Sequence, residues 1–325
     1  MAQHSTGYMF GFAAGVCLVC SIIVSGAAVS LKPLQEENKL LDKQKKVLIV
    51  AGLMREGEEV SNEEIGKRFE ENIEAKVVEL SSGKYAEGIE ASTFDQRKAS
   101  KDPKLSVEAP ANAAKVRRLP NNAVVYQVMS DGELSKLILP VEGKGLWSTL
   151  YGFVALETDA NTISGLTFYE DGETPGLGGE INNPAWKGLW KGRQVYRVDG
   201  KEHHPQIEVI KGAAGPAADD PFHVDGLSGA TITSRGVTEL MRFWLGANGF
   251  GPYLNNEFWN GSDPLYVAGA SADGAKPTKA KAKKKGKGKK GKRKKDKRKK
   301  GKAKMGKGKK GKDAKKPGPK KEGGN

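Results

Sequence analysis

The first hydrophobic feature of the chain is an apolar stretch from Tyr8 to Leu31, which contains no Asp, Glu, Lys or Arg. A helix needs roughly 20 such residues to cross a bilayer, so this stretch is long enough for a transmembrane helix. A cleaved signal peptide is the alternative, because Ser25–Ala28 resembles a small-residue cleavage site. Signal peptides usually begin with basic residues, and residues 1–7 contain no Lys or Arg. The pattern therefore favours an uncleaved membrane anchor over residues 1–31.

Two amphipathic segments follow the anchor. The first is predicted to be a helix over residues 34–53, and a second helix is expected to begin at Ser61, where Glu64 completes a capping box. The buried positions of the second helix recur every four residues and are Ile65, Phe69 and Ile73. Residues 83–120 are polar and hard to assign to helix or strand. Residues 32–121 are therefore treated as a helical and irregular membrane-proximal region.

From Asn122 onward the hydrophobic period is that of β-strands. The predicted strands are short runs of β-branched and aromatic residues separated by turn residues, at 123–130, 136–141, 151–158, 162–170, 193–200 and 206–212. A further helix is predicted after Thr233, because apolar residues recur at i, i+3, i+4, i+7 and i+8 from Val237. Helices at both ends of an antiparallel sheet give an α+β fold. Residues 122–265 are expected to form its main domain.

The formal net charge of +15 combines two very different regions. Residues 276–325 contain 27 Lys or Arg against 3 Asp or Glu, whereas the rest of the chain contains 27 against 36. From about Ser271 the sequence is mostly Lys, Gly and Ala and offers no apolar residues able to build a core. Residues 266–325 are therefore expected to be a disordered basic tail on an acidic body. Such a tail can adhere to anionic membranes or bind nucleic acid non-specifically.

The most informative segment is DGLSGATITSRGV at residues 225–237. It is a glycine-containing loop that runs into the predicted helix, and the N-terminus of a helix presents unpaired N–H groups to a phosphate. Gly229 lets the backbone approach a ligand closely. The hydroxyl groups in the segment belong to Ser228, Thr231, Thr233 and Ser234. An ordinary Ser/Thr-rich helix cap has the same pattern, so spacing alone does not identify a modified residue.

This segment resembles the flavinylation motif Asp-x-x-Ser/Thr-Gly-Ala-Thr, in which a separate flavin transferase joins FMN through a phosphoester to the last threonine. The resemblance makes Thr231 the acceptor. The other motif positions that it assigns to the cofactor site are Asp225, Ser228, Gly229, Ala230 and Thr233. Three longer stretches, STFDQRKASKD, ILPVEGKGLWSTLYGFVALETD and YEDGETPGLGGEI, also look like one family. That family is NqrC, the C subunit of the sodium-translocating NADH:quinone oxidoreductase, and the resemblance covers roughly residues 10–260.

The resemblance also assigns a second loop to the expected FMN site. In ETPGLG at residues 173–178, Pro175 and Gly176 suit a type II turn. In the resembled family this loop lies against the isoalloxazine ring, so Glu173 and Thr174 would supply polar contacts, Leu177 would pack on the ring, and Gly178 would complete the loop. Two further candidates are Lys211, as a partner of flavin or phosphate charge, and Trp147, as a wall of the pocket. An exposed lysine and a core tryptophan fit the same residues equally well. No metal site and no separate acid–base residues are expected.

The resemblance implies an electron-carrying FMN subunit of a respiratory sodium pump, which relays electrons from NADH toward quinone. The expected partners are the other subunits of a six-subunit complex, the flavin transferase and the cell inner membrane. The flavin domain is expected on the periplasmic side, where the transferase acts, so no nucleic-acid partner is expected for the tail. The positive-inside rule alone favours the opposite orientation, because five lysines follow the apolar stretch within residues 32–46 and none precedes it.

Two other functions fit parts of the pattern. The FMN subunit of the related ferredoxin:NAD oxidoreductase (Rnf-type) complex shares the Ser-Gly-Ala-Thr loop, but it should lack the long region at 40–140. The second alternative is a membrane-anchored, non-enzymatic binding protein that acts through its basic tail. A covalently bound flavin would be absent from such a binding protein and present in both flavin carriers.

Overall fold

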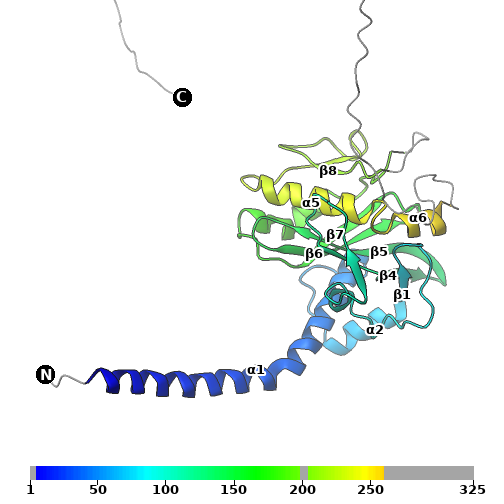
Figure 1. The fold of residues 1–325 in the computed structure, drawn as a ribbon. Coiled ribbons are helices and arrows are strands. Elements are labelled where there is room, and N and C mark those ends of the chain that lie inside the picture. The colour runs from blue at the N-terminus through cyan, green and yellow to red at the C-terminus, as the bar shows by residue number, and fades with distance from the viewer. Residues whose placement is uncertain (1–4, 198–203, 260–325) are drawn as a thin grey trace, which may run out of the picture. The chain divides into compact units, whose positions relative to one another are not determined.

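The computed structural model describes residues 5–197 and 204–259, and Figure 1 shows their arrangement. The predicted disordered tail at 266–325 lies outside the described residues. The helices are α1 (Thr6–Ala51), α2 (Asn62–Asn72), α3 (Gln96–Ala99), η1 (Gly178–Asn182), α4 (Pro184–Gly188), α5 (Thr231–Trp244) and α6 (Gly251–Phe258). The strands are β1 (Ile73–Glu79), β2 (Ser106–Glu108), β3 (Arg118–Pro120), β4 (Asn122–Ser130), β5 (Glu133–Lys144), β6 (Thr149–Glu157), β7 (Ile163–Glu170), β8 (Glu208–Val209) and β9 (His223–Val224).

An antiparallel sheet of five strands, in the order β1-β4-β5-β6-β7, is the centre of the fold. Strands β4 to β7 follow one another along the chain as a meander, as short β-branched runs with tight turns predict. In Figure 1, α5 lies along the sheet, and the C-terminal part of α1 reaches the same sheet. The predicted α+β class, with helices from both ends of the chain around an antiparallel sheet, is confirmed.

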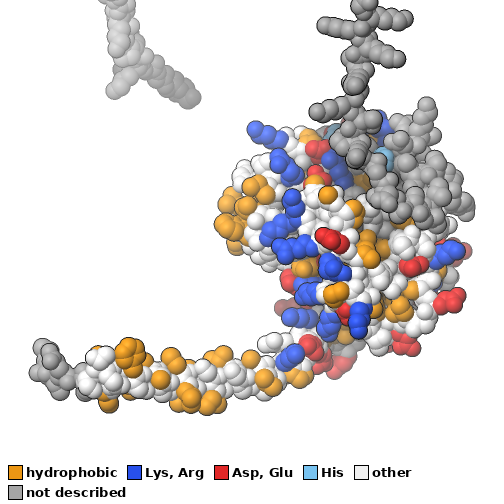
Figure 2. Space-filling model, viewed as in Figure 1, with side chains coloured by type: hydrophobic (Ala, Val, Ile, Leu, Met, Phe, Trp, Pro, Cys, Tyr) orange, Lys and Arg blue, Asp and Glu red, His pale blue; other side chains and the backbone are white. Residues whose placement is uncertain are grey.

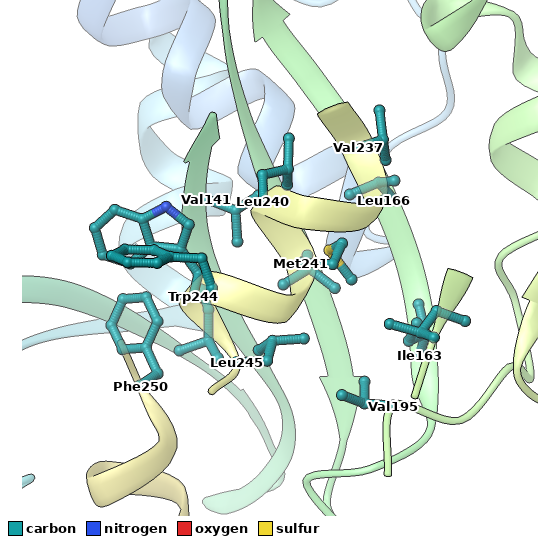
Figure 3. Packing of buried hydrophobic residues seen from close by; sticks show 14 of the residues in the cluster. Val141, Ile163, Leu166, Val195, Val237, Leu240, Met241, Trp244, Leu245 and Phe250 are labelled. Carbon is teal, nitrogen blue, oxygen red and sulfur yellow. The ribbon is translucent and has the colours of Figure 1, made fainter. Parts of the chain in front are cut away.

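One face of the sheet is covered by α5. The apolar positions predicted from Val237 onward are all buried, and Figure 3 shows Leu240, Met241 and Trp244 packed against side chains of the sheet such as Val141 and Leu166. The indole N–H of Trp244 donates to the carbonyl oxygen of Glu142 on β5 at 2.7 Å. Burial of this stripe fixes the position of α5, and therefore of its first turn, relative to the sheet.

The opposite face of the sheet is partly covered by the last turns of α1. Residues of α1 that include Val47, Leu48 and Val50 pack with Ile138 and Phe153 of the sheet in a second core cluster. On β5, Val141 packs in the cluster under α5 and Ile138 in the cluster under α1, because successive side chains of a strand point to opposite faces. Both faces are therefore buried, which explains why the central strands are apolar along most of their length rather than strictly alternating.

Helix α1 continues without a break through Pro33, so the predicted anchor and the predicted helix at 34–53 form a single element. Its N-terminal part is long and apolar enough to cross a membrane, with a mean hydropathy of 2.3 over the most apolar window, and that window is fully exposed. A signal sequence at the start of a chain has the same length and composition. The apolar helix is the feature that suggests membrane anchoring.

Three sequence predictions are corrected by the structure. Ile73 is not on the second helix, because α2 ends at Asn72 and Ile73 opens β1, which pairs along its whole length with β4. Residues 193–197 form no strand but two isolated bridges, Gln194 with Thr162 and Tyr196 with Pro205, and the N–H of Gln194 donates to the carbonyl oxygen of Pro221 in a loop. The predicted strand at 206–212 shortens to β8, a two-residue parallel pair with β9. Each correction concerns pairing with a segment distant in sequence.

Candidate functional site

The first two residues of α5, Thr231 and Ile232, are exposed, and the helix has no side-chain cap. Thr231 is the first helical residue, Ala230 precedes it, and no side chain accepts a hydrogen bond from the turn. The N–H groups of Thr231, Ile232 and Thr233 have no acceptor among the described residues, as expected for the first turn of an uncapped helix. The Thr231 side chain is exposed. An exposed hydroxyl therefore stands beside unpaired backbone donors and the positive end of a helix dipole, which together suit a phosphate group.

The loop before this helix meets the ETPGLG loop through Gly229. Gly229 has a φ of +70°, and a Cβ built there would lie 2.9 Å from Cδ2 of Leu177. Only glycine adopts this backbone region readily. Thr174 to Leu177 forms the predicted turn, in which Gly176 has a φ of +76° and the N–H of Leu177 donates to the carbonyl oxygen of Thr174 at 3.1 Å. These two glycine-dependent loops lie side by side at the start of α5.

Glu173 lies beneath these loops with its carboxylate fully engaged. Its Oε2 accepts a hydrogen bond of 2.6 Å from the hydroxyl of Thr233, and its Oε1 accepts N–H bonds from Trp147 at 2.9 Å and Ser148 at 3.4 Å. Burial acts to raise the pKa of Glu173, but these hydrogen bonds outweigh it and hold the pKa below the usual value for glutamate. Glu173 and Thr233, both expected at the flavin, are buried rather than exposed at the surface of the site.

Exposed apolar side chains lie on the first turn of α5 and on the neighbouring loops. Four large ones from the neighbouring loops and the first turn of α5 are exposed, namely Leu146, Trp147, Leu177 and Ile232. In the view of Figure 2, hydrophobic side chains gather at the edge of the domain where Figure 1 places the N-terminal end of α5. Trp147 is 66% exposed, which excludes the core role that its sequence also allowed. Leu146 and Ile232 are additions to the sequence prediction.

The remaining candidates lie around this cluster in different roles. Asp225 accepts the N–H of Ala214 with its carboxylate at 2.8 Å and the indole N–H of Trp186 with its carbonyl oxygen at 2.9 Å, so it fixes the loop. Ala230 is buried, whereas Ser228 and Thr174 are exposed. Gly178 packs directly behind Glu173 and Thr233. Lys211 is exposed in the segment after β8, and no described residue makes a polar contact with its side chain.

A separate cleft of about 1440 Å³ opens on the α1 side of the sheet. Aromatic residues of the sheet, including Tyr126, Tyr151 and Tyr169, line it together with Arg97, whose guanidinium lies 3.7 Å from the centre of the Tyr151 ring. None of the residues expected to hold FMN lines this cleft. This cleft is therefore distinct from the loops around Thr231.

Comparison with known proteins places the chain in a family. The FMN-binding domain family matches residues 145–246, a range that includes both loops and α5. The C subunit of the Na(+)-translocating NADH-quinone reductase of Pseudomonas aeruginosa is 49% identical over 257 residues, covering 78% of this chain and 97% of its own length. The corresponding protein from Vibrio alginolyticus is 50% identical over 246 residues, covering 75% of this chain and 92% of its own. The chain belongs to the NqrC family of Na(+)-translocating NADH-quinone reductase subunits.

Solved structures of the NqrC family share this fold. The crystal structure of Shewanella oneidensis NqrC superimposes with a TM-score of 0.61 at 36% identity and covers 69% of this chain and 98% of its own. That of the C subunit from Parabacteroides distasonis gives a TM-score of 0.53 at 30% identity, covering 69% and 96%. The resemblance that the motifs predicted is thus confirmed over most of the chain, and the alternative of a non-enzymatic tail-binding protein loses its support.

Proposed function

We propose that this chain is the FMN-carrying subunit of a sodium-translocating NADH:quinone oxidoreductase, with FMN attached through a phosphoester to the hydroxyl oxygen of Thr231. The single observation that carries the proposal is the exposed Thr231 hydroxyl at the uncapped first turn of α5. The family match over residues 145–246 supports FMN as the cofactor. The donors present fit the group, because the N–H groups of Thr231, Ile232 and Thr233 have no acceptor among the described residues and lie at the positive end of the α5 dipole.

Different residues of the chain would hold the phosphate and the ring system of the cofactor. The N–H groups of the first turn of α5 would bind the phosphate, and the Thr231 oxygen would keep the cofactor attached in every redox state. The exposed side chains of Trp147, Leu177 and Ile232 would pack on the ring system and exclude water from part of it. Thr174 and Ser228 would supply hydrogen bonds to the cofactor, and Lys211 would supply a positive charge. Bound FMN supplies the electron-carrying chemistry, which the protein itself lacks.

The proposal extends to the setting of the protein. The apolar part of α1 anchors the chain in the cell inner membrane, and the domain that carries Thr231 lies on the periplasmic side. A flavin transferase in that compartment forms the phosphoester, and the mature chain joins the other subunits of a six-subunit complex. In that complex it relays electrons from NADH toward quinone as a carrier rather than as a complete active site. The length of the region at 40–140 favours this assignment over the ferredoxin:NAD oxidoreductase relative.

The test is covalent flavin fluorescence. The full chain is expressed with a flavin transferase, denatured on a gel and examined under ultraviolet light, and the peptide containing Ser228–Ser234 is analysed by mass spectrometry. The expected result is a fluorescent band that Thr231→Ala abolishes and that Thr233→Ala or deletion of residues 276–325 leaves visible. An unmodified Thr231 in chain taken from an assembled complex would refute the proposal.

A further inference from the structure

One buried side chain joins all three segments that form the candidate site. Glu173 comes from the loop after β7, its partners Trp147 and Ser148 come from the loop between β5 and β6, and Thr233 comes from the first turn of α5. None of these segments is adjacent to another in the sequence. The carboxylate of Glu173 therefore fixes the positions of the two loops relative to the helix that presents Thr231.

The carboxylate packs closely against two glycines. A Cβ built at Gly145 would lie 2.6 Å from Oε1 of Glu173, and one built at Gly178 would lie 2.5 Å from its Oε2. The lack of a side chain at both glycines therefore makes room for the carboxylate. Only 7% of the Glu173 surface is exposed. The side chain cannot turn outward to reach a ligand without breaking these contacts.

The carboxylate is also an ionised group without a paired cation. No Lys or Arg among the described residues forms a salt bridge with Glu173. Its negative charge is stabilised instead by the hydroxyl of Thr233, by backbone N–H groups and by the positive end of α5. Hydrogen bonds from neutral donors hold a charge in place but do not cancel its net field. A negative charge therefore persists just beneath the loops that face the cofactor.

We propose that Glu173 is a positioning residue for the flavin rather than a ligand of it, and that its buried negative charge lowers the reduction potential of the flavin. The inference rests on the proposed attachment of FMN at Thr231. Adding an electron beside a fixed negative charge is unfavourable, and a charge beneath the surface is screened less by water and salt than an exposed one. Positioning and potential are separable, because one depends on hydrogen bonds and the other on net charge.

Two substitutions of Glu173 separate these two roles. Glu173→Gln keeps the shape and an acceptor oxygen for the N–H groups of Trp147 and Ser148, but it removes the charge. Glu173→Ala removes both. Glu180→Gln is the matched control, since Glu180 lies in the adjacent turn, is only half-buried and hydrogen-bonds Asn183 rather than the loops of the site. Each full-length variant is expressed with the flavin transferase, and its flavin loading and midpoint potential are measured.

Glu173→Gln is expected to load flavin at the wild-type level and to have a more positive midpoint potential than both the wild type and Glu180→Gln. Glu173→Ala is expected to lower flavin loading by on the order of tenfold or more, because small misplacements of reacting groups have large effects on rate. A Glu173→Gln potential equal to that of Glu180→Gln, or full loading of Glu173→Ala, would overturn the inference. If Glu173→Ala fails to fold, the potential of Glu173→Gln still decides. A wild-type chain without covalent flavin would instead refute the proposed function.

Discussion

Helix α5 approaches the sheet closely at Gly236. Substitution of this glycine tests quantitatively whether α5 packs against the end of β5. A Cβ built at Gly236 would lie 2.4 Å from the carbonyl oxygen of Lys144 and 3.3 Å from Cα of Gly145. Both are backbone atoms at the end of β5, so no side-chain rotation relieves the clash. An ordinary contact needs roughly 3.5 Å, so the Gly236→Ala helix must move away from the sheet by roughly 1 Å.

The size of the effect follows from two opposing contributions. Overpacking a well-packed contact costs about 1–3 kcal/mol, and a backbone clash belongs at the upper end of that range. Replacing glycine by alanine inside a helix returns about 1 kcal/mol. The net loss in the free energy of unfolding is therefore about 2 kcal/mol, which lowers the Tm by about 4–8 °C in a domain of this size. The shift of α5 also moves Thr231, so flavin loading should fall.

Gly66→Ala is the matched control. Gly66 lies inside α2, and nothing lies within 4 Å of a Cβ built there. The same substitution should stabilise the protein by about 1 kcal/mol and raise the Tm by about 2–4 °C. Thermal unfolding of the full chain in detergent, followed by circular dichroism, measures both variants. Equal Tm values for the two variants would show that α5 does not rest on β5 as described.

Three further predictions concern the site and its supports. Gly229→Ala should lower the free energy of unfolding by about 1–2 kcal/mol, because alanine is strained at a positive φ. It should also reduce flavin fluorescence on a denaturing gel, and unchanged fluorescence would argue against the described loop conformation. Burial raises the pKa of Glu142 above its value in the unfolded chain, so the folded protein loses stability as rising pH ionises this carboxyl group. In urea unfolding, Glu142→Gln should therefore increase the free energy of unfolding at pH 7 but not near about pH 4, where the carboxyl group is protonated. An equal increase at both pH values would show that the ionisation of Glu142 is not the cause. The buried ammonium of Lys187 donates to both carboxylate oxygens of Glu56, at 2.5 and 2.6 Å. Glu56→Ala should lower the free energy of unfolding by about 1–3 kcal/mol because it leaves this ammonium without its partner. Adding Lys187→Met should recover most of that stability, and a further, additive loss would refute the pairing.

Local pattern predicted the parts of the fold that depend on neighbouring residues. The stripe from Val237 to Leu245 is buried on α5, and four of the predicted strands appear as β4 to β7. The turn at Pro175–Gly176 also follows from the residues in it. These elements obey short-range rules of periodicity and turn chemistry. The strand β1 was missed because its stability comes from pairing with β4, more than 40 residues away in the chain.

The candidate site was likewise predicted only in part from the sequence. The sequence singled out Thr231 and the ETPGLG loop, because the motif and its resemblance to a family are properties of the chain alone. It could not distinguish an exposed Trp147 from a core tryptophan, or a buried Glu173 from a surface ligand. Both outcomes depend on how the loops after β5 and β7 meet the first turn of α5. No residue pattern within a single loop contains that information.

The amino-acid sequence by itself determined the apolar helix at the N-terminus, the α+β class, the basic composition of the tail and the motif that makes Thr231 the candidate for cofactor attachment. Each of these depends on residue type and on spacing along one segment. The tertiary structure alone decided which groups became solvent-exposed and which were sealed inside. It left Thr231 exposed and buried Glu173 against Thr233, because hydrogen bonds between segments distant in the chain set the burial of each polar group.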